Sequence, residues 1–447
     1  MHVLPQLRRL EESFHRELVV VGVHSPKYRA ERELANLRQA VLRLEIQHPV
    51  VSDPNMILWS EYAVRAWPTL MLVDPAGKLI GRHEGEFRFE EFQPLVAAIV
   101  SESDARGMLD RRPFPLRPEH PPDSPLLFPG KVLADAASGR LFVADSGHDR
   151  VVVATLDGQV RQIVGGRKGF RDGASHEAAF HKPQGMALDG DLLYVADTWN
   201  HAIRCIDLTT GRVATVAGTG EQMLRVKEGP ARSTPLNSPW ALAIHRGVLY
   251  VAMAGSHQIW AFDPSSGEMA RYAGTGREAL VDGTLARSTF AQPSGLTTDG
   301  QRLYVADTES NAIRAVDLPN GRGQVRTLVG LGLFDFGDAD GTGDQVRLQH
   351  PTGICFDAST GTLLVADSYN SKIKRLDPHA TRTVTLLGSG LPGLLDGAGS
   401  SAALWEPTGL SMIPGRLYVA DANNHAVRVV ELDTLRVSTL EFPGLSP

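Results

Sequence analysis

Short apolar runs rich in valine, isoleucine and tyrosine recur along residues 127–447, each bounded by glycine, asparagine or aspartate. The clearest run ends in Leu/Val-Ala-Asp, and its copies lie 52 to 60 residues apart. Four such runs per copy are typical of strands joined by hairpins. Six copies predict a closed ring of small sheets, a six-bladed β-propeller whose blades are stable only when they stack. The last residues of the recurring run are Asp145, Asp197, Met253, Asp307, Asp367 and Asp421.

A second pattern fills the connections between the copies: Asp-Gly, then an apolar residue, then a proline that opens a Pro-x-Gly step. In the second copy these residues are Asp172-Gly173, Phe180 and Pro183. We interpret Asp-Gly as a turn and the apolar residue as an anchor on the blade, because ordering a long loop costs conformational entropy.

Residues 1–103 alternate between helical and strand-like patterns, which predicts an α/β layer structure. The next segment, 104–126, carries six prolines, including Pro113, and is expected to be a semi-rigid extended linker. The elements expected in the first part are helices over 3–14, 31–44, 58–64 and 90–100 and strands over 18–23, 70–73 and 79–82.

Composition narrows the function classes. The 447 residues carry 45 Lys and Arg against 51 Asp and Glu, a net charge of −6, so we do not expect a nucleic-acid partner held through phosphates. No apolar run approaches the ~18 residues of a membrane span, so we expect no membrane partner. The start of the chain has no secretory apolar region, which predicts a cytoplasmic location. The two cysteines, Cys205 and Cys355, form no Cys-x-x-Cys pair.

Two motifs in the repeats, Asn200-His-Ala-Ile-Arg204 and Asn424-His-Ala-Val-Arg428, resemble the NHL repeat. The first part resembles the thioredoxin-like domain of the NHL repeat-containing protein 2 family. The resemblance implies a mainly β fold: an incomplete thioredoxin-like α/β domain over 1–103, a linker over 104–126 and a six-bladed NHL propeller over 127–447. The matching motifs in the first part are Val21-Gly-Val-His24-Ser25, Ala40-Val-Leu-Arg43, His48-Pro49 and Trp67-Pro68-Thr69.

The sequence departs from that family at its start. The resemblance implies a Cys-x-x-Cys pair immediately before a helix that opens with Met-His-Val-Leu-Pro, and this chain begins at that Met1. It also implies an interior strand between 18–23 and 70–73, whose loss would leave backbone groups unpaired on both neighbours. We interpret Met1 as lying downstream of the true start. The alternative is a genuine short form whose remnant is a structural or binding appendage.

Trp67, Pro68 and Thr69 form the first candidate binding site. The resemblance implies that the Trp67-Pro68 bond is cis and that the flanking backbone receives an extended substrate. Without a thiol, these residues would bind a partner and not react with it. We therefore assign no catalytic residue to this chain.

The recurring aspartates form a second candidate constellation. Carboxylates around a ring axis would suit Ca²⁺, but a residue that every blade carries is better explained as part of the blade. A basic residue lies seven positions after the aspartate in four copies, as in Asp197 and Arg204, whereas the third copy has Met253 and Trp260. Because removing one member of a buried ion pair strands the other, this joint loss predicts that the two residues are paired.

The third copy is also the candidate for a specialised surface. It replaces Pro-x-Gly with Pro239-Trp240-Ala241, so that Trp240, Met253 and Trp260 add apolar bulk. Exposed, the three would form a partner-binding patch; buried, they would be a repacked blade. We expect Trp260 to be buried and leave Trp240 open.

These observations favour a protein-binding scaffold carrying a redox-type appendage that is inactive in this chain, with a redox role in cell homeostasis in a longer form. The alternative is a propeller enzyme, a metal-dependent lyase or lactonase with a small-molecule site at the ring axis. Histidines show no metal-ligand spacing, so no metal site or cofactor is assigned. The alternative requires histidines and carboxylates to converge at the axis. RNA binding ranks last because residues 128–447 carry a net charge of −4.

Overall fold

The computed structural model describes residues 3–112, 115–223, 226–319 and 322–447. Met1, His2 and Pro113 of the predicted features lie outside the described residues. The chain divides into two units, Met1–Pro121 and Pro122–Pro447.

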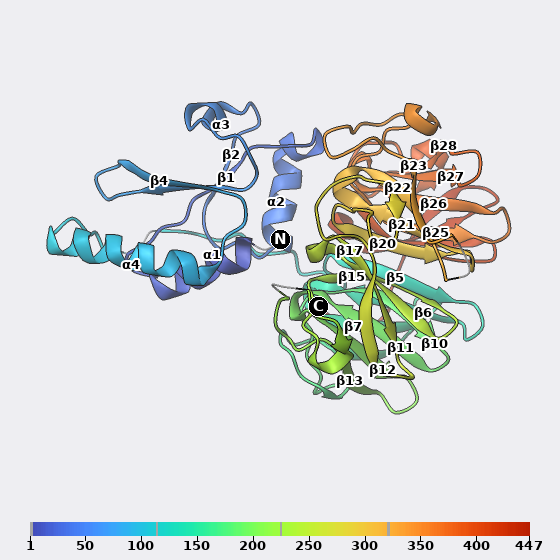
Figure 1. The fold of residues 1–447 in the computed structure, drawn as a ribbon. Helices are drawn as coiled ribbons and strands as arrows, with labels where there is room; N and C mark the ends of the chain where they lie inside the picture. The colour runs from blue at the N-terminus through green and yellow to red at the C-terminus, as the bar shows by residue number, and fades with distance from the viewer. Residues whose placement is uncertain (1–2, 113–114, 224–225, 320–321) are drawn as a thin grey trace. The chain divides into compact units, whose positions relative to one another are not determined.

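The N-terminal unit contains four helices and four short strands within its described residues. The expected helices all form, and each strand has one hydrogen-bonded partner. Phe87, Phe92, Val96 and Leu10 make its small buried core. The elements are α1 (Val3–Ser13), β1 (Gly22–His24), α2 (Leu34–Arg43), β2 (Val50–Ser52), α3 (Ile57–Glu61), β3 (Thr69–Val73), β4 (Leu79–Glu84) and α4 (Phe89–Ala105) (Figure 1).

Two differences from the sequence-based expectation concern β1 and β2. The strand expected over 18–23 is restricted to β1, because its parallel pairing with β2 joins only Gly22–His24 to Val50–Ser52. The β2 strand was not predicted, since its apolar run is only two valines long. β1 and β2 form one sheet, and β3 and β4 form another. Among the described residues, no strand joins β1 to β3.

The C-terminal unit is the predicted six-bladed propeller. Each blade has four antiparallel strands in sequence order, and the first strand of each blade, called here the inner strand, lines the central channel. In Figure 1 the chain passes around the ring from the first blade to the last, coloured red. The six inner strands are β5 (Pro129–Asp135), β10 (Pro183–Asp189), β15 (Pro239–His245), β20 (Pro293–Thr298), β25 (Pro351–Asp357) and β30 (Pro407–Ile413).

The second and third strands carry the Leu/Val-Ala-Asp run and the basic residue that follows it. The second strands are β6 (Arg140–Asp145), β11 (Leu192–Asp197), β16 (Val248–Met253), β21 (Arg302–Asp307), β26 (Thr362–Asp367) and β31 (Arg416–Asp421). The third strands are β7 (Arg150–Thr155), β12 (Ala202–Asp207), β17 (Gln258–Asp263), β22 (Ala312–Asp317), β27 (Lys372–Asp377) and β32 (Ala426–Glu431). Apolar side chains on both faces of these strands are buried between neighbouring blades.

The outer strands show where the Asp-Gly interpretation was wrong. Asp-Gly is not a turn: the glycine begins a two-residue strand on the outer strand of the following blade. Gly173 has a φ of +145°, a conformation that glycine adopts readily. The outer strands are β8 (Val160–Gly165), β13 (Arg212–Ala217), β18 (Glu268–Ala273), β23 (Gln324–Val329), β28 (Arg382–Leu387) and β33 (Arg436–Leu440). The added strands are β9 (Gly173–Ala174), β14 (Gly229–Pro230), β19 (Gly283–Thr284), β24 (Gly341–Thr342) and β29 (Gly397–Ala398).

The apolar anchors of these connections are confirmed. Phe180, Phe290, Leu348 and Leu404 are all fully or almost fully buried. Each joins the core of its propeller blade, so the long connections are fixed at their middle as well as at their ends.

The last blade packs directly on the first, with β30 beside β5. The Tyr418 hydroxyl donates to the Leu156 carbonyl at 2.9 Å, and the Arg150 guanidinium donates to the Ser446 carbonyl at 2.9 Å. Phe442 and Leu445 of the C-terminal segment are buried in the same cluster as the first blade. The ring is therefore closed by packing and hydrogen bonds between complete blades.

Candidate functional site

The first candidate site is organised by Asp53, a buried carboxylate that follows β2. Its oxygens accept the backbone N–H groups of Ile57, Leu58 and Trp59 and the hydroxyl of Ser25 at 2.7 to 3.2 Å. Burial alone would raise the pKa of Asp53, but these hydrogen bonds outweigh burial and the net pKa lies below its ordinary value. Asp53 is thus held ionised at neutral pH and fixes α3 relative to β1.

Trp67 is positioned by the same group of residues. Its indole N–H donates to the Ser25 carbonyl at 2.9 Å, and its ring lies against Trp59 with centroids 4.3 Å apart. The Trp67-Pro68 bond is cis, as predicted. Trp67 is 45% exposed although its indole nitrogen is bonded. An aromatic ring held in one orientation at a surface is well suited to anchoring a partner.

Thr69 begins β3 directly after the cis bond. Its hydroxyl donates to the Ala66 carbonyl at 2.7 Å, and the Pro68 carbonyl accepts the Gly85 N–H at 2.8 Å. Among the described residues, the backbone N–H and C=O of Trp67 have no hydrogen-bond partner. The structure therefore brings Trp67, Pro68 and Thr69 together as one surface, with Trp67 offering both an aromatic ring and unpaired backbone groups.

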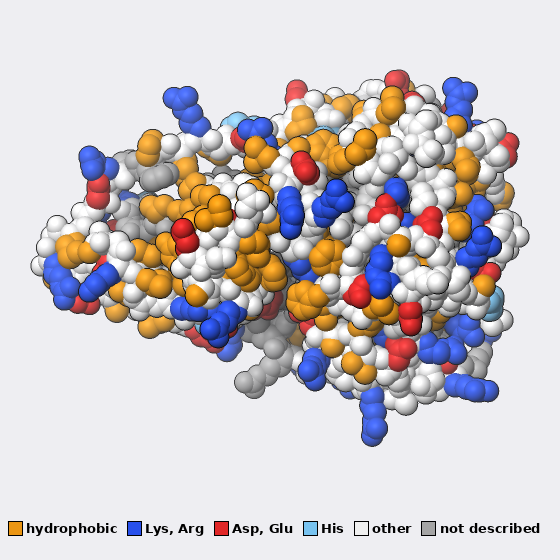
Figure 2. Space-filling view, turned by 90° about the horizontal axis from the view of Figure 1, so that it is seen from above, with side chains coloured by type: hydrophobic (Ala, Val, Ile, Leu, Met, Phe, Trp, Pro, Cys, Tyr) orange, Lys and Arg blue, Asp and Glu red, His pale blue; other side chains and the backbone are white. Residues whose placement is uncertain are grey.

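The N-terminal unit that carries this surface also exposes apolar side chains. β3 is paired on one side only, with β4, and its other edge has no strand partner among the described residues. Figure 2 shows hydrophobic side chains gathered on the N-terminal unit. An open strand edge beside exposed apolar side chains is the usual setting for adding an extended segment. The exposed large apolar side chains of the N-terminal unit include Val19, Val21, Val23, Val51, Ile57, Tyr62, Val73, Leu79 and Ile80.

The two thiols lie elsewhere, in strands of the propeller. Burial raises the pKa of Cys205 to about 11, and burial raises the pKa of Cys355 further. Both are therefore thiols at neutral pH, and the thiolate is the reactive form.

The recurring aspartates are structural, as predicted. Asp197 is fully buried and contacts Arg204 at 2.8 Å, while the Asn200 side chain and the His181 N–H donate to its two oxygens. Burial raises the pKa of Asp197 to about 6, and Arg204 acts in the opposite direction. Asp307 and Asp421 are held in the same way, and Asp145 pairs with Arg150.

The Asp of each Asp-Gly step completes this arrangement, a role that the sequence analysis missed. Asp172 accepts Arg204 at 2.7 Å and both the N–H and the hydroxyl of Thr215. Each arginine therefore lies between a buried carboxylate of its blade and a more exposed one from the preceding connection. The missed signal is the fixed spacing of 32 residues between Asp172 and Arg204, which recurs at Asp282, Asp396 and their arginines.

The third blade is repacked and offers no large exposed patch. Met253 and Trp260 are fully buried, and Trp240 is half-buried at the start of β15. The Trp260 indole donates to Gln258 at 3.0 Å, which satisfies its one donor. The expectation that Trp260 is buried is confirmed, and Met253 is buried as well, so of the two alternatives the repacked blade holds for both residues. Both fill the space that an ion pair occupies in other blades.

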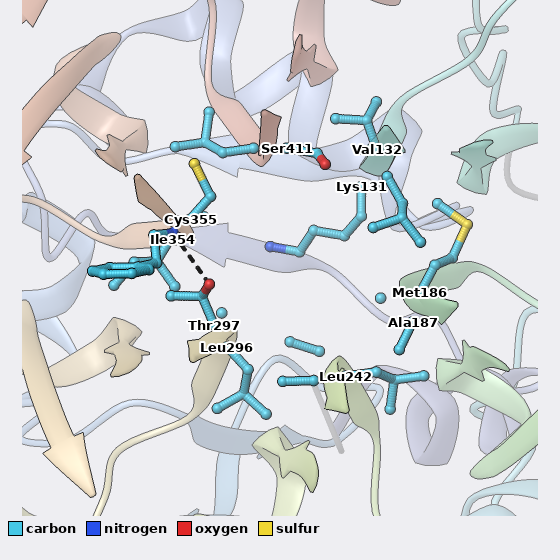
Figure 3. Close-up of a pocket in the computed structure, with 18 of the residues that line it drawn as sticks. Lys131, Val132, Met186, Ala187, Leu242, Leu296, Thr297, Ile354, Cys355 and Ser411 are labelled. Atoms are coloured by element: carbon cyan, nitrogen blue, oxygen red, sulfur yellow. Dashed lines mark hydrogen bonds between the residues drawn. The ribbon is translucent and has the colours of Figure 1, made fainter. Parts of the chain in front are cut away.

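The ring axis holds a cavity of about 410 Å³ that is lined by all six inner strands. Its wall combines apolar side chains with polar groups, and Lys131 projects into it (Figure 3). The described residues include no group of three or more His, Cys, Asp or Glu placed to hold a metal ion. The metal-dependent alternative therefore finds no ligand set in the described part of the chain.

Comparison with known proteins agrees with both units. Residues 1–79 match the thioredoxin-like family, and residues 180–206 and 348–376 match the NHL repeat. NHL repeat-containing protein 2 of Homo sapiens is 39% identical over 479 residues, covering 98% of this chain and 66% of that protein. This chain belongs to the NHL repeat-containing protein 2 family.

A plant protein is also similar to this chain over its whole length. Protein SUPPRESSOR OF QUENCHING 1, chloroplastic, of Arabidopsis thaliana is 42% identical over 473 residues, covering 100% of this chain and 44% of that protein. A solved gluconolactonase from Xanthomonas campestris is 17% identical with a TM-score of 0.46, covering 67% of this chain and 84% of its own. The chain thus spans about two thirds or less of the curated relatives' length.

No helix among the described residues of this chain is long and apolar enough to cross a membrane.

Besides the Asp-Gly aspartates, the sequence analysis missed Asp53 and Lys131. Asp53 carried no repeat or motif. Lys131 did carry a signal, since it stands in the Pro-x-Gly frame of the first blade, where other blades have glycine or alanine.

Proposed function

We propose that this chain is a protein-binding scaffold whose thioredoxin-like unit receives an extended polypeptide segment at Trp67, Pro68 and Thr69. The observation that carries the proposal is Trp67, whose ring is exposed and oriented while its backbone groups have no partner among the described residues. The partner lies along the open edge of β3 as an added strand. Its backbone bonds to the main chain there, and an apolar side chain packs on the indole.

The groups present at the Trp67 site favour partner binding over thiol chemistry in this chain. Asp53 is ionised but fully occupied by α3 and Ser25, so it is not available as a general base. The nearest chemistry the site offers is backbone hydrogen bonding and apolar contact. In a longer chain with a Cys-x-x-Cys pair before Met1, the same surface would present a substrate to that pair, and the protein would serve redox homeostasis. We place the protein and its partner binding in the cytoplasm.

The experiment is a peptide-display selection against the full chain, followed by Kd measurements by fluorescence anisotropy. We expect linear peptides with apolar side chains to be selected and Trp67→Ala to weaken the best of them about 30-fold, the effect of losing one aromatic hot spot. Leu95→Ala removes an equally exposed apolar side chain from α4 and serves as the control. Equal affinity of Trp67→Ala and the wild type would show that the site does not bind peptides.

A further inference from the structure

Lys131 is the exception in the ring of inner strands. Lys131 is the third residue of its inner strand and pairs with Ala144 of the second strand. The corresponding residue of the third blade is Ala241, which pairs with Ala252, and in the other four blades it is glycine. A Cβ on Gly295 or Gly353 would approach the next inner strand's carbonyl oxygen to 2.9 or 2.8 Å. Five blades therefore keep this level of the ring nearly free of side chains, and the first blade inserts a lysine there.

The Lys131 ammonium reaches the inner strands of the fifth and sixth blades. Its Nζ donates to the carbonyl oxygens of Thr352 at 2.5 Å and Thr408 at 2.6 Å. An ammonium has three N–H donors, and the described residues supply no third acceptor and no carboxylate partner. Burial lowers the pKa of Lys131 to about 7. A buried cation without a counter-ion is costly, so the site is electrostatically incomplete.

The cavity around this nitrogen offers apolar side chains as well as polar groups. Its wall includes Val132, Met186, Leu242, Leu296, Ile354 and Leu410. The hydroxyls of Thr297 and Ser411 accept N–H groups of neighbouring inner strands, at 3.2 and 2.8 Å. In Figure 3 the Lys131 side chain extends into the middle of the channel, with its nitrogen toward Thr297 and Ile354.

Two other titratable groups line this cavity, Asp135 and Cys355. Asp135 has a pKa below its ordinary value because Ser138 donates to it, and Cys355 is neutral because burial raises its pKa. Within the described residues, Lys131 is the one cation in the wall. A cavity of this size that combines apolar side chains with a few polar groups has the usual composition of a small-molecule site.

We propose that the propeller channel binds a small organic acid with an apolar body, whose carboxylate accepts the third N–H of Lys131. The carboxylate supplies the missing counter-ion, and the apolar body lies against the six inner strands. This site is separate from the Trp67 surface and does not depend on the function proposed for it. Binding requires the charged lysine, so a proton is taken up when the acid binds at alkaline pH.

The test is isothermal titration calorimetry of the full chain with octanoate and phenylacetate, each compared with its neutral amide. We expect one acid to bind one site at least tenfold more tightly than its amide. Between pH 6.5 and 8.5 its affinity should fall roughly 20-fold as the lysine loses its proton. The proton taken up at pH 8.5 is read from the heats in two buffers of different ionisation enthalpy.

Two variants separate ligand binding from folding. Lys131→Met removes the charge at similar length, and Lys131→Gln removes it but keeps N–H donors. Both should weaken acid binding at least tenfold while the thermal unfolding transition remains cooperative. Lys227→Met, an exposed lysine of the same unit, should leave binding unchanged. Acids and amides that bind alike, no binding of either acid at 1 mM, or an unchanged affinity in Lys131→Gln would overturn the proposal and leave Lys131 as a tether between blades.

Discussion

Single buried charges determine the local structure of both units, and each is used differently. Asp53 is surrounded by donors, Asp307 is paired with an arginine, and Lys131 has only two neutral acceptors. Asp53 has its hydrogen bonds filled and fixes α3, Asp307 is one half of an ion pair, and Lys131 lacks a counter-ion. The number of partners per charge is therefore what distinguishes structural residues from a binding group in this protein.

Asp53 should make the order of α3 depend on pH. Its pKa is lower in the folded state than the ordinary ~3.9, so it stabilises the folded state above that value and ceases to do so as pH falls through the folded pKa. Asp53→Asn should cost about 1–3 kcal/mol at pH 7. Hydrogen-exchange protection of Ile57, Leu58 and Trp59 should be higher in the wild type at pH 7, and the difference between the two proteins should shrink as the pH falls below about 4. A constant difference from pH 7 to 3 would contradict this role.

At this scale the sequence predicted the residues that repeat and missed those that do not. The pairing of the recurring aspartates with arginines followed from comparing copies. Asp53 occurs once, so no second copy showed what it does. Whether Trp240 is buried depended on the packing of β15 against its neighbours, which no pattern of residue types contains.

The blade is the element of this fold, and its charges are replaceable only as a set. Arg314 is fully buried between Asp307, at 3.1 Å, and Asp282, at 2.8 Å. The third blade shows the apolar alternative, in which Met253, Gln258 and Trp260 occupy the corresponding positions. The Nε of Arg314 has no hydrogen-bond partner among the described residues, but its two other guanidinium nitrogens are bonded to the carboxylates, as the Trp260 indole is bonded to Gln258.

Transplanting the third-blade solution tests this interdependence. Asp307→Met alone should destabilise the propeller by about 3–5 kcal/mol, because it removes one partner of a buried ion pair. The triple variant Asp307→Met, Ala312→Gln, Arg314→Trp should lose less, since Gln and Trp can pair as Gln258 and Trp260 do. The measurement is the free energy of unfolding in guanidinium chloride. A triple variant less stable than Asp307→Met would show that the charges act independently.

Element boundaries were predictable where the pattern was long and were missed where it was short. The five Leu/Val-Ala-Asp strands, the third-blade strand that ends in Met253, and the helices of the N-terminal unit lie where the sequence predicted them. The two-residue strands at Asp-Gly were misread as turns, because their pairing depends on an outer strand some 40 residues away. β1 came out shorter than its apolar run, because strand length is set by the partner strand.

At the scale of the whole molecule, the propeller is held as a ring by its last residues. Phe442 and Leu445 pack into the first blade, and the guanidinium of Arg150 bonds to the carbonyl of Ser446. These contacts join residues almost 300 positions apart. Ring closure is therefore the step on which burial of every blade face depends.

Closure predicts unequal effects for two phenylalanines. Phe442→Ala should destabilise the propeller by about 3 kcal/mol, the typical cost of emptying a buried aromatic site. Phe334→Ala, at a position that is 75% exposed, should change the free energy of unfolding by less than about 0.5 kcal/mol. Chemical denaturation of both variants followed by circular dichroism provides the comparison. Equal effects would argue against closure through the C-terminal segment.

The proposed scaffold function makes one direct demand, that a bound peptide should cover the Trp67 surface. Hydrogen exchange of the full chain, with and without the best selected peptide, measures this residue by residue. The account predicts added protection at residues 67–73 in the wild type and in Leu95→Ala, and none in Trp67→Ala. Protection confined to the propeller, or unchanged protection at 67–73 with peptide bound, would contradict it.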